Sequence, residues 1–208
     1  MEQLIIAGTG VHAAEMSEIA CRINREKKTW ELLGYITMDT TRVGETYNGY
    51  PVLGTVAALR QYPNAHIVPD NEWTHFTEIP PERFISLVDP QSFVSRTARI
   101  GRGCVIYPNC YIGLHASLGD FVFCLAGSTI NHDTIIENRV IVASGVTLAG
   151  SVHVESDCYL GQSCSVRQYI KVGMNSLIGM GSVVVKDVSP DSVMAGNPAR
   201  KVRARSEI

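Results

Sequence analysis

The sequence predicts a mixed fold, with a small Rossmann-like α/β domain over residues 1–90 and a parallel β-helix over residues 91–208. Two observations support this prediction. The first ninety residues alternate short apolar runs with amphipathic helical patterns, which is typical of α/β units. From Val94 onward an apolar residue recurs at every sixth position, without interruption, as far as Val184.

The six-residue repeat predicts a solenoid in which each flat side of a coil takes one hexad. Four residues after each large apolar position, from Ala98 to Val188, comes a residue no larger than valine, with Ile170 as the exception. The large residue fills the interior, and the small residue lies where the chain turns. If three hexads close a coil, the repeat gives about five coils stacked at about 4.8 Å. Side chains outside these two sites must face outward or lie at a corner.

The first domain is expected to begin with a buried strand, a tight turn at Gly8-Thr9-Gly10 and a helix. Glycines after a strand let backbone N–H groups approach an anion, so this turn is a candidate phosphate-binding site. The third glycine of a dinucleotide fingerprint is replaced by Ala13, so no nicotinamide cofactor is expected. The other expected elements are strands at 3–7, 32–36, 66–68 and 85–88, and short helices at 55–62 and around 71–76.

The composition excludes several classes of partner. A net charge of −2 and a pI near 6.3 predict no surface for nucleic acid or an anionic membrane. The sequence has no 18-residue apolar run and no basic amino-terminal signal, so we expect neither a membrane span nor secretion, and a cytoplasmic location. Five of the six cysteines occupy hexad sites, which predicts packing residues in a reducing compartment. No spacing of histidine, cysteine and carboxylate residues predicts a metal site.

The repeat resembles the left-handed β-helix of the hexapeptide acyltransferases. The resemblance rests on an aliphatic residue that is followed by glycine and, four residues after the aliphatic one, by a small residue. This pattern recurs at Ile100-Gly101, Ile112-Gly113, Leu118-Gly119, Leu160-Gly161, Val172-Gly173 and Ile178-Gly179. The closing segment, residues 195–200, resembles the usual exit from that helix. The resemblance implies a left-handed coil.

Nearly the whole chain resembles a more specific group, the sugar O- and N-acetyltransferases of bacterial surface-glycan synthesis (the NeuD/PglD group). The features shared are the Gly8-x-Gly10-x-His12-Ala13 turn, the segment at residues 49–54, the unbroken hexads and an outward His-Asp pair. The resemblance implies acetyl-CoA as donor and a homotrimer that binds this donor between neighbouring prisms. It also implies that the first domain holds the nucleotide of a nucleotide-linked sugar.

This resemblance gives the first domain its substrate-binding candidates. The sequence departs from the group at two places: Val11 stands where a further glycine is common, and Thr37-Met38-Asp39 keeps only one acid where the group usually has a pair. The candidate substrate-binding residues are Gly8, Thr9, Gly10, His12 and Asp39.

His132 and Asp133 are the candidate catalytic residues. His132 lies between the two inward sites of its hexad, Ile130 and Thr134, so it is expected at a corner. A neutral imidazole can remove a proton near pH 7, and an adjacent carboxylate can fix its tautomer and raise its basicity. The pair resembles the catalytic histidine of the family with its acidic neighbour. The alternative is an ordinary solvated corner histidine.

Coil arithmetic adds a third candidate at the catalytic corner. One coil is 18 residues, so Gly150 is expected one layer above His132. A glycine there leaves room for a thioester, and its N–H group is a candidate oxyanion donor. His115, 17 residues before His132, is expected about one coil away and is a candidate for lining the acceptor pocket.

A second column of residues spaced 18 apart, Ala143, Gly161 and Gly179, has only minimal side chains and is expected to form a groove for the pantetheine arm. Basic residues near the carboxyl terminus are candidates for binding the phosphates of coenzyme A. The alternative for the column is that glycine is common at this hexad position without any ligand. The alternative for the basic residues is a solvated tail. The candidate cofactor-binding residues are Ala143, Gly150, Gly161, Gln162, Gly179, Met180, Arg200 and Lys201.

Together these features predict a cytoplasmic acetyltransferase that uses acetyl-CoA and acts on the amino group of an amino sugar, with His132 as general base. Two alternatives stay open. One is O-acetylation of a sialic-acid-like sugar, and the other is a non-catalytic β-helix that serves as a scaffold. The sequence does not distinguish N- from O-acetylation, and it does not identify the sugar or its nucleotide.

Overall fold

The computed structural model describes residues 1–71 and 79–207 of the chain. The chain divides into two compact units, residues 1–90 and 91–208. The short helix expected around residues 71–76 falls on residues 72–78 and lies outside the described residues.

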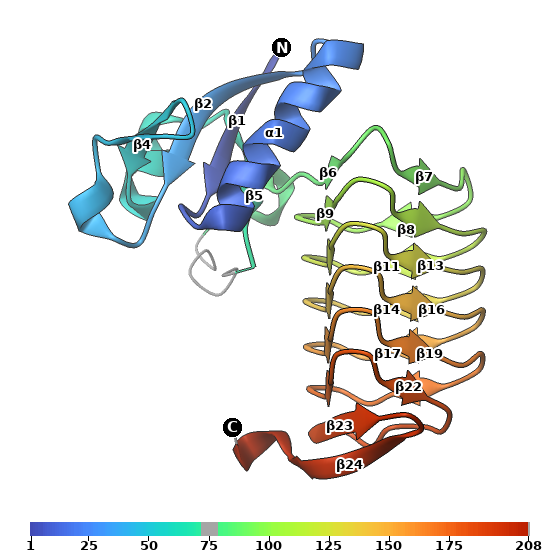
Figure 1. The fold of residues 1–208 in the computed structure, drawn as a ribbon. Coiled ribbons are helices and arrows are strands. Elements are labelled where there is room, and N and C mark those ends of the chain that lie inside the picture. The colour runs from blue at the N-terminus through green and yellow to red at the C-terminus, as the bar shows by residue number, and fades with distance from the viewer. Residues whose placement is uncertain (72–78, 208) are drawn as a thin grey trace. The chain divides into compact units, whose positions relative to one another are not determined.

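The first unit is built on a sheet with the strand order β3-β4-β2-β1-β5 (Figure 1). Its central strand β1 pairs in parallel with β2 and β5, and β4 pairs in parallel with β2. The helix α1 (Val11–Glu26) packs on this sheet and buries Ala13, Met16 and Ile19. The strands are β1 (Glu2–Ala7), β2 (Trp30–Ile36), β3 (Thr46–Tyr47), β4 (Tyr50–Gly54) and β5 (His66–Pro69), and the 3₁₀ helices are η1 (Thr40–Arg42), η2 (Val56–Gln61) and η4 (Pro81–Arg83).

The structure confirms the expected strands at 3–7, 32–36 and 66–68 and a short helix within 55–62. The strand expected at 85–88 is wrong in extent and in place. Only β6 (Leu87–Val88) forms there, and it is not part of the five-stranded sheet. The fourth parallel strand of that sheet is β4, which sequence reasoning missed because Pro51, Gly54 and the preceding Gly49 give this stretch the composition of a turn.

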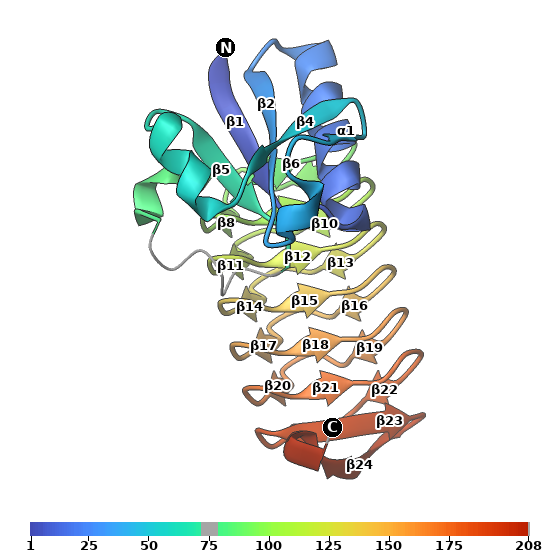
Figure 2. The same cartoon turned by 90° about the vertical axis from the view of Figure 1, so that its left-hand side faces the viewer.

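The second unit is a left-handed β-helix with three flat faces, seen in Figures 1 and 2 as stacked rows of short strands. Strands 18 residues apart pair in parallel, as Thr129 does with Thr147, so three hexads close one coil as predicted. The first face holds β7 (Phe93–Val94), β10 (Tyr111–Ile112), β13 (Thr129–Ile130), β16 (Thr147–Leu148), β19 (Ser165–Val166) and β22 (Val183–Val184).

The other two faces follow the same 18-residue register. The second face holds β8 (Arg99–Ile100), β11 (Ser117–Leu118), β14 (Ile135–Ile136), β17 (His153–Val154) and β20 (Lys171–Val172). The third face holds β9 (Val105–Ile106), β12 (Phe123–Cys124), β15 (Ile141–Val142), β18 (Tyr159–Leu160), β21 (Leu177–Ile178) and β23 (Ser192–Gly196), and is closed by the antiparallel β24 (Ala199–Ala204) before a 3₁₀ helix η5 (Arg205–Glu207).

The interior of the β-helix confirms the hexad pattern. Every large site from Ile106 to Val184 and every small site from Cys104 to Val188 is buried. The five hexad cysteines are buried as packing residues, and burial raises the pKa of the Cys164 thiol to about 12. The residue before each small site, from Gly103 to Gly181, has a φ between +53° and +73°. This left-handed residue turns the chain from one face to the next.

Candidate active site

The candidate catalytic histidine lies where the chain turns from the first face to the second, which we call the first corner. His132 follows β13 and precedes β14, and its side chain is 61% exposed. Its Nδ1 atom lies 2.8 Å from Oδ2 of Asp133. A neutral imidazole that donates Nδ1–H to this carboxylate has its lone pair on Nε2, the atom that would take a proton from a substrate.

The local backbone explains how two consecutive residues face each other. Asp133 occupies the left-handed position of its corner, with φ +58°, and its N–H donates to the carbonyl of Leu114 in the preceding coil. Aspartate tolerates this conformation better than most residues other than glycine. The turn therefore brings the Asp133 carboxylate back against the His132 ring.

Gly150 stacks directly on His132, as coil arithmetic predicts. A Cβ atom at position 150 would lie 2.5 Å from both Nε2 and Cε1 of His132, so only glycine leaves the imidazole where it is. The N–H groups of Ala149 and Ser151 donate to the carbonyls of Val166 and His132, whereas the Gly150 N–H makes no backbone hydrogen bond within the described part of the chain. Residue 150 is buried under the His132 ring, and its N–H has no acceptor among these backbone carbonyls.

The predicted pantetheine column lies at a different corner, where the chain turns from the third face to the first, which we call the third corner. Ala143 is 1% exposed, and a Cβ atom at Gly161 would lie 2.6 Å from the carbonyl oxygen of Ile178 in the next coil. The close stacking of the backbones of successive coils explains why these residues are small. An open groove on a single chain does not explain it. Contact of this column, including Gly179, with coenzyme A stays a prediction.

The remaining cofactor candidates lie on the surface of the β-helix. Gln162 and Met180 are exposed beside the third-corner column, Met180 with 73% of its area. Arg200 and Lys201 are exposed on β24, which is a paired strand and not the tail that the sequence suggested. Their side chains are accessible to an anionic ligand.

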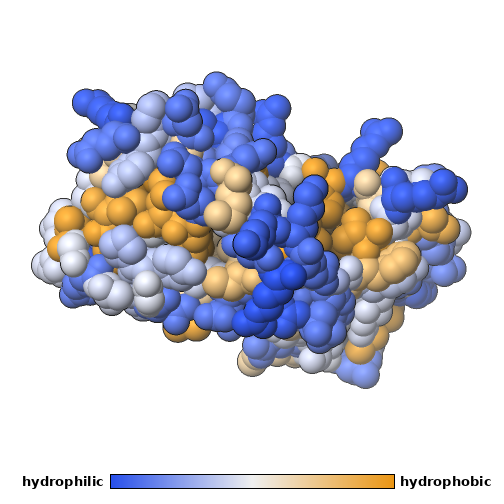
Figure 3. Space-filling model, turned by 90° about the horizontal axis from the view of Figure 1, so that it is seen from above, coloured by the Kyte–Doolittle hydropathy of each residue, from blue (hydrophilic) through white to orange (hydrophobic). Residues whose placement is uncertain are grey.

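Exposed apolar side chains gather near the first corner. Leu114, in the coil before that of His132, is 54% exposed, Ile135 at the start of β14 is 46% exposed, and Tyr169 is 73% exposed. Figure 3 shows one face of the molecule, on which hydrophobic residues lie among hydrophilic ones. His115 occupies the position of Asp133 in the preceding coil, since the two are 18 residues apart, and both have a left-handed backbone.

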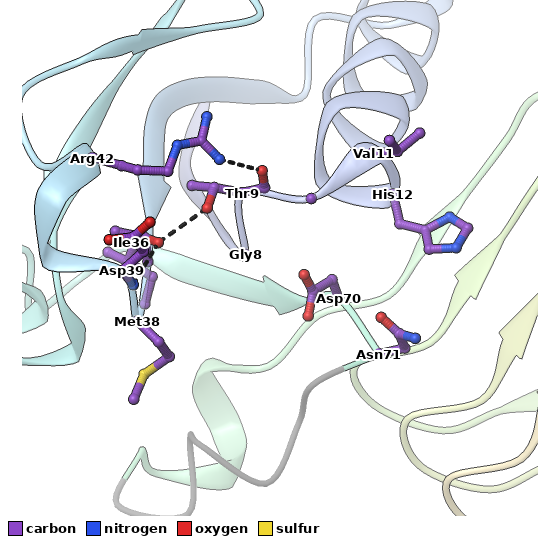
Figure 4. A pocket seen from close by; sticks show the side chains of 12 residues that line it. Gly8, Thr9, Val11, His12, Ile36, Met38, Asp39, Arg42, Asp70 and Asn71 are labelled. Atoms are coloured by element: carbon purple, nitrogen blue, oxygen red, sulfur yellow. Dashed lines mark hydrogen bonds between the residues drawn. The ribbon is translucent and has the colours of Figure 1, made fainter.

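The first unit contains a pocket of about 380 Å³ at the carboxyl ends of β1, β2 and β5 (Figure 4). The pocket brings together all five predicted substrate-binding residues: Gly8, Thr9, Gly10, His12 and Asp39. Parallel sheets bind ligands at this edge, where the strand order reverses. The helix α1 begins at the pocket with no side-chain cap on its amino terminus, which favours anions.

Hydrogen bonds fix the glycine turn on the side of β2. The hydroxyl of Thr9 lies 3.0 Å from that of Thr37, Arg42 donates to the carbonyl of Thr9, and Tyr47 donates to the carbonyl of Gly10. Figure 4 shows Arg42 and Thr9 in contact at the rim. The turn is therefore held in one conformation, with the carbonyls of Thr9 and Gly10 bound by Arg42 and Tyr47.

The two carboxylates of the pocket have different surroundings. Asp39 accepts hydrogen bonds from the hydroxyl and the N–H of Thr41, and these bonds lower the pKa of Asp39. Asp70, at the end of β5, is 7% exposed, and sequence reasoning missed it. A Cβ atom at Gly8 would lie 1.9 Å from Oδ2 of Asp70, so this carboxylate fills the space beside the glycine. Its position after a short strand gave no signal of its own.

The structure describes no metal centre and no membrane helix. Residues 1–71 and 79–207 contain no group of three or more histidine, cysteine or acidic side chains placed to hold a metal ion. Within the same ranges no helix has the length and apolarity needed to cross a membrane.

Comparison with known proteins places this geometry on a known fold. The acetyltransferase domain of PglB from Neisseria gonorrhoeae FA1090, in complex with acetyl coenzyme A, superposes with a TM-score of 0.86 at 26% identity, over 97% of this chain and 99% of that chain. The chain has the fold of the hexapeptide-repeat sugar acetyltransferases. PerB from Caulobacter crescentus, in complex with CoA and GDP-perosamine, superposes with a TM-score of 0.87 at 21% identity over 98% of both chains.

This acetyltransferase fold extends over nearly the whole chain. WeeI from Acinetobacter baumannii AYE matches 96% of this chain and all of its own with a TM-score of 0.78 at 21% identity. No protein-family model and no curated protein matches the sequence. The similarity to these known proteins is therefore a similarity of fold.

Proposed function

We propose that the protein is an acetyl-CoA-dependent acetyltransferase that acts on the amino group of a nucleotide-linked amino sugar in bacterial surface-glycan synthesis. The observation that supports this proposal is the His132–Asp133 pair with Gly150 against the imidazole. The fold adds support, because structures that share it include an acetyltransferase domain with acetyl coenzyme A and an enzyme with CoA and GDP-perosamine.

In the proposed reaction the acceptor amine attacks the carbonyl carbon of the thioester. Nε2 of His132 takes the proton that the amine loses, and Asp133 keeps the imidazole in the tautomer that leaves Nε2 unprotonated. The Gly150 N–H stabilises the oxyanion of the tetrahedral intermediate. The C–S bond then breaks, and the proton held by His132 passes to the departing thiolate, which leaves as the free thiol of coenzyme A.

The exposure of the catalytic pair supports a homotrimer. His132 is 61% exposed in a single chain, and a base surrounded by water lacks the enclosed, dry site that acyl transfer needs. The exposed apolar residues Leu114, Ile135 and Tyr169 suit burial against a second copy. In this assembly the third corner of one prism faces the first corner of its neighbour, and the donor lies between them. Arg200 and Lys201 then meet phosphates of coenzyme A.

The pocket in the first unit is the proposed site of the nucleotide. The glycine turn, the uncapped start of α1 and His12 line it together, and amide N–H groups at a helix start suit a diphosphate. We place the reaction in the cytoplasm, which agrees with six free cysteines.

Release of free thiol from acetyl-CoA tests the proposal. We expect release with an amino-sugar nucleotide such as GDP-perosamine, and none with the same sugar whose amine is replaced by a hydroxyl. Release only with a sugar lacking a free amine favours O-acetylation. No release with any acceptor, together with a His132→Ala variant that binds every ligand as the unmodified chain does, favours the scaffold alternative.

A further inference from the structure

The glycine turn at the start of α1 has a backbone that many conformations would suit. Gly8 has φ +136°, and Gly10 has an extended backbone with φ −84° and ψ 179°. Glycine leaves such conformations at little steric cost, so a turn with two glycines loses much conformational freedom when it is fixed. The contacts that fix this turn therefore determine how well it is arranged before a ligand binds.

Two side chains hold consecutive peptide groups of the turn. Nη1 of Arg42 donates to the carbonyl of Thr9 over 2.7 Å (Figure 4), and the hydroxyl of Tyr47 donates to the carbonyl of Gly10 over 2.9 Å. In a trans peptide the carbonyl and the following N–H point in opposite directions. The N–H groups of Gly10 and Val11 therefore point away from the two donors. Within the described residues, neither N–H donates to a backbone carbonyl.

Tyr47 acts on the turn from outside the pocket. Arg42 is one of the residues that line the pocket, and Tyr47 is not. The guanidinium carbon of Arg42 lies 4.6 Å from the centre of the Tyr47 ring, so each side chain supports the other. Arg42 is placed for direct contact with a ligand phosphate, whereas Tyr47 reaches a ligand only through the turn.

The β3–β4 hairpin fixes the place of Tyr47. Its loop, Asn48-Gly49, has φ +42° and +82°, as expected for a two-residue Asn-Gly hairpin turn. Nδ2 of Asn48 donates to Oγ of Ser17 on α1 over 2.9 Å. The buried ring of Tyr35 on β2 lies 5.3 Å from the ring of Tyr47, centre to centre. The hairpin is therefore attached to both α1 and β2, which keeps the Tyr47 hydroxyl at the turn.

We propose that Tyr47 is a positioning residue of the nucleotide site, whose hydroxyl fixes the Gly10 peptide so that the amides of the turn face the diphosphate of the ligand. This inference rests on the proposed function for the class of ligand. A turn that is already arranged loses less conformational freedom on binding, and this raises the affinity. Tyr47 contacts neither the donor nor the reacting atoms, so it sets nucleotide affinity and leaves the chemistry unchanged.

Calorimetric titration of the full chain with UDP and GDP tests the inference without any acetyl transfer. Tyr47→Phe removes only the hydroxyl that bonds Gly10. For the nucleotide that the unmodified chain prefers, we expect about three- to tenfold weaker binding by this variant, because one hydrogen bond that arranges the turn is lost. Thermal unfolding checks that the variant is folded.

Tyr50→Phe is the matched control. Tyr50 pairs with Tyr47 in the same hairpin and also lies outside the pocket, but its hydroxyl lies 3.4 Å from the thiol of Cys21. We expect this variant to bind the nucleotide as the unmodified chain does.

Inorganic pyrophosphate, added as a competitor of the preferred nucleotide, locates the effect on the ligand. It carries no base and no sugar, so Tyr47→Phe should weaken pyrophosphate by the same factor as the nucleotide. Should Tyr47→Phe fail to fold, Arg42→Lys decides. It keeps the positive charge but loses the planar fork that bonds Thr9 and stacks on the Tyr47 ring, so nucleotide and pyrophosphate should weaken together.

Other results overturn the inference. These are unchanged nucleotide binding by folded Tyr47→Phe, an equal loss in Tyr50→Phe, a loss for the nucleotide without one for pyrophosphate, and an unmodified chain that binds neither nucleotide or that pyrophosphate does not compete for. In the second case, Arg42→Lys with unchanged binding does the same. Failure of the proposed function looks different, since a chain that holds a diphosphate at the turn and transfers no acetyl group fails only in the chemistry.

Discussion

At the scale of single residues, the geometry of the first corner depends on the two neighbours of His132, Asp133 and Gly150. The left-handed backbone at Asp133 turns the carboxylate onto Nδ1, and the missing side chain at Gly150 leaves room for the imidazole itself. The hexad spacing predicted the stacking of residue 150 on residue 132. The lack of a backbone hydrogen bond from the Gly150 N–H, within the described residues, follows from the hydrogen-bond pattern of the corner.

Gly150→Ala is expected to displace the imidazole. The new Cβ atom would lie 2.5 Å from Nε2 of His132, while the backbone at position 150 has an ordinary φ and accepts alanine. We expect kcat to fall by about 10- to 100-fold, because a displacement of about 1 Å can cost a hundredfold. The change in melting temperature should be small, since an exposed ring can move.

Ser151→Ala is the control for this variant, because it alters the next residue of the same corner without adding an atom near His132. Equal activity of Gly150→Ala and the unmodified chain would show that the imidazole does not act from its present position.

At the scale of elements, the hexads determine the β-helix because every large site points inward. Ile130 in β13 is fully buried, whereas Ile135 in β14 is 46% exposed. We expect Ile130→Ala to lower the free energy of unfolding by about 2–5 kcal/mol, because it leaves a cavity. Because Ile135 belongs to the surface proposed to meet a second copy, the control is Val202→Ala on β24, which is 63% exposed and should cost less than about 1 kcal/mol. Chemical denaturation measures both, and similar losses would contradict the assigned faces.

The hydrogen-bonded carboxylate of Glu137, beside β17, gives a pH dependence of stability. Partial burial raises the pKa of Glu137, but hydrogen bonds from His153 and Ser156 outweigh it, and the pKa is lowered from its ordinary value of 4.5. A lowered carboxyl pKa adds stability above the ordinary value, and this stability is lost as the pH falls through the lowered pKa.

Melting temperatures measured between about pH 3 and pH 6 test this pH dependence in the unmodified chain and in Glu137→Gln. We expect the variant to melt at a lower temperature at pH 6 and the difference to shrink towards pH 3. A difference that is constant or grows in acid would contradict the assignment.

The elements also show where sequence reasoning stops. The regular hexads predicted both the coil length and the inward-facing sites, because a repeat of six residues fits one side of a three-sided coil and places the same two positions inside each time. The strand β4 was missed because Pro51 and its flanking glycines hide a strand that needs only Val52 and Gly54 for pairing with β2. The pocket residue Asp70 was missed because it lies beside Gly8, which is 62 residues away in the chain and adjacent in space.

At the scale of the whole molecule, activity is expected to require assembly. Sedimentation of the unmodified chain should give a mass of three chains. Leu114→Asp places a charge among the exposed apolar residues of the first corner, so we expect it to weaken the trimer and to lower activity by more than about tenfold. Met174→Asp is the control, because Met174 is also an exposed apolar residue but lies at the corner between the second and third faces. A fully active monomer would refute the proposed assembly.

The central claim is that Nε2 of His132 removes the proton from an acceptor during acetyl transfer. The direct test is the rate of thiol release from acetyl-CoA with an amino-sugar nucleotide by the unmodified chain, His132→Ala and Asp133→Asn. The account predicts that His132→Ala lowers kcat by about 10²- to 10⁴-fold, and Asp133→Asn by less, while both variants stay folded and bind acetyl-CoA. A folded His132→Ala variant that turns over at the rate of the unmodified chain would contradict it.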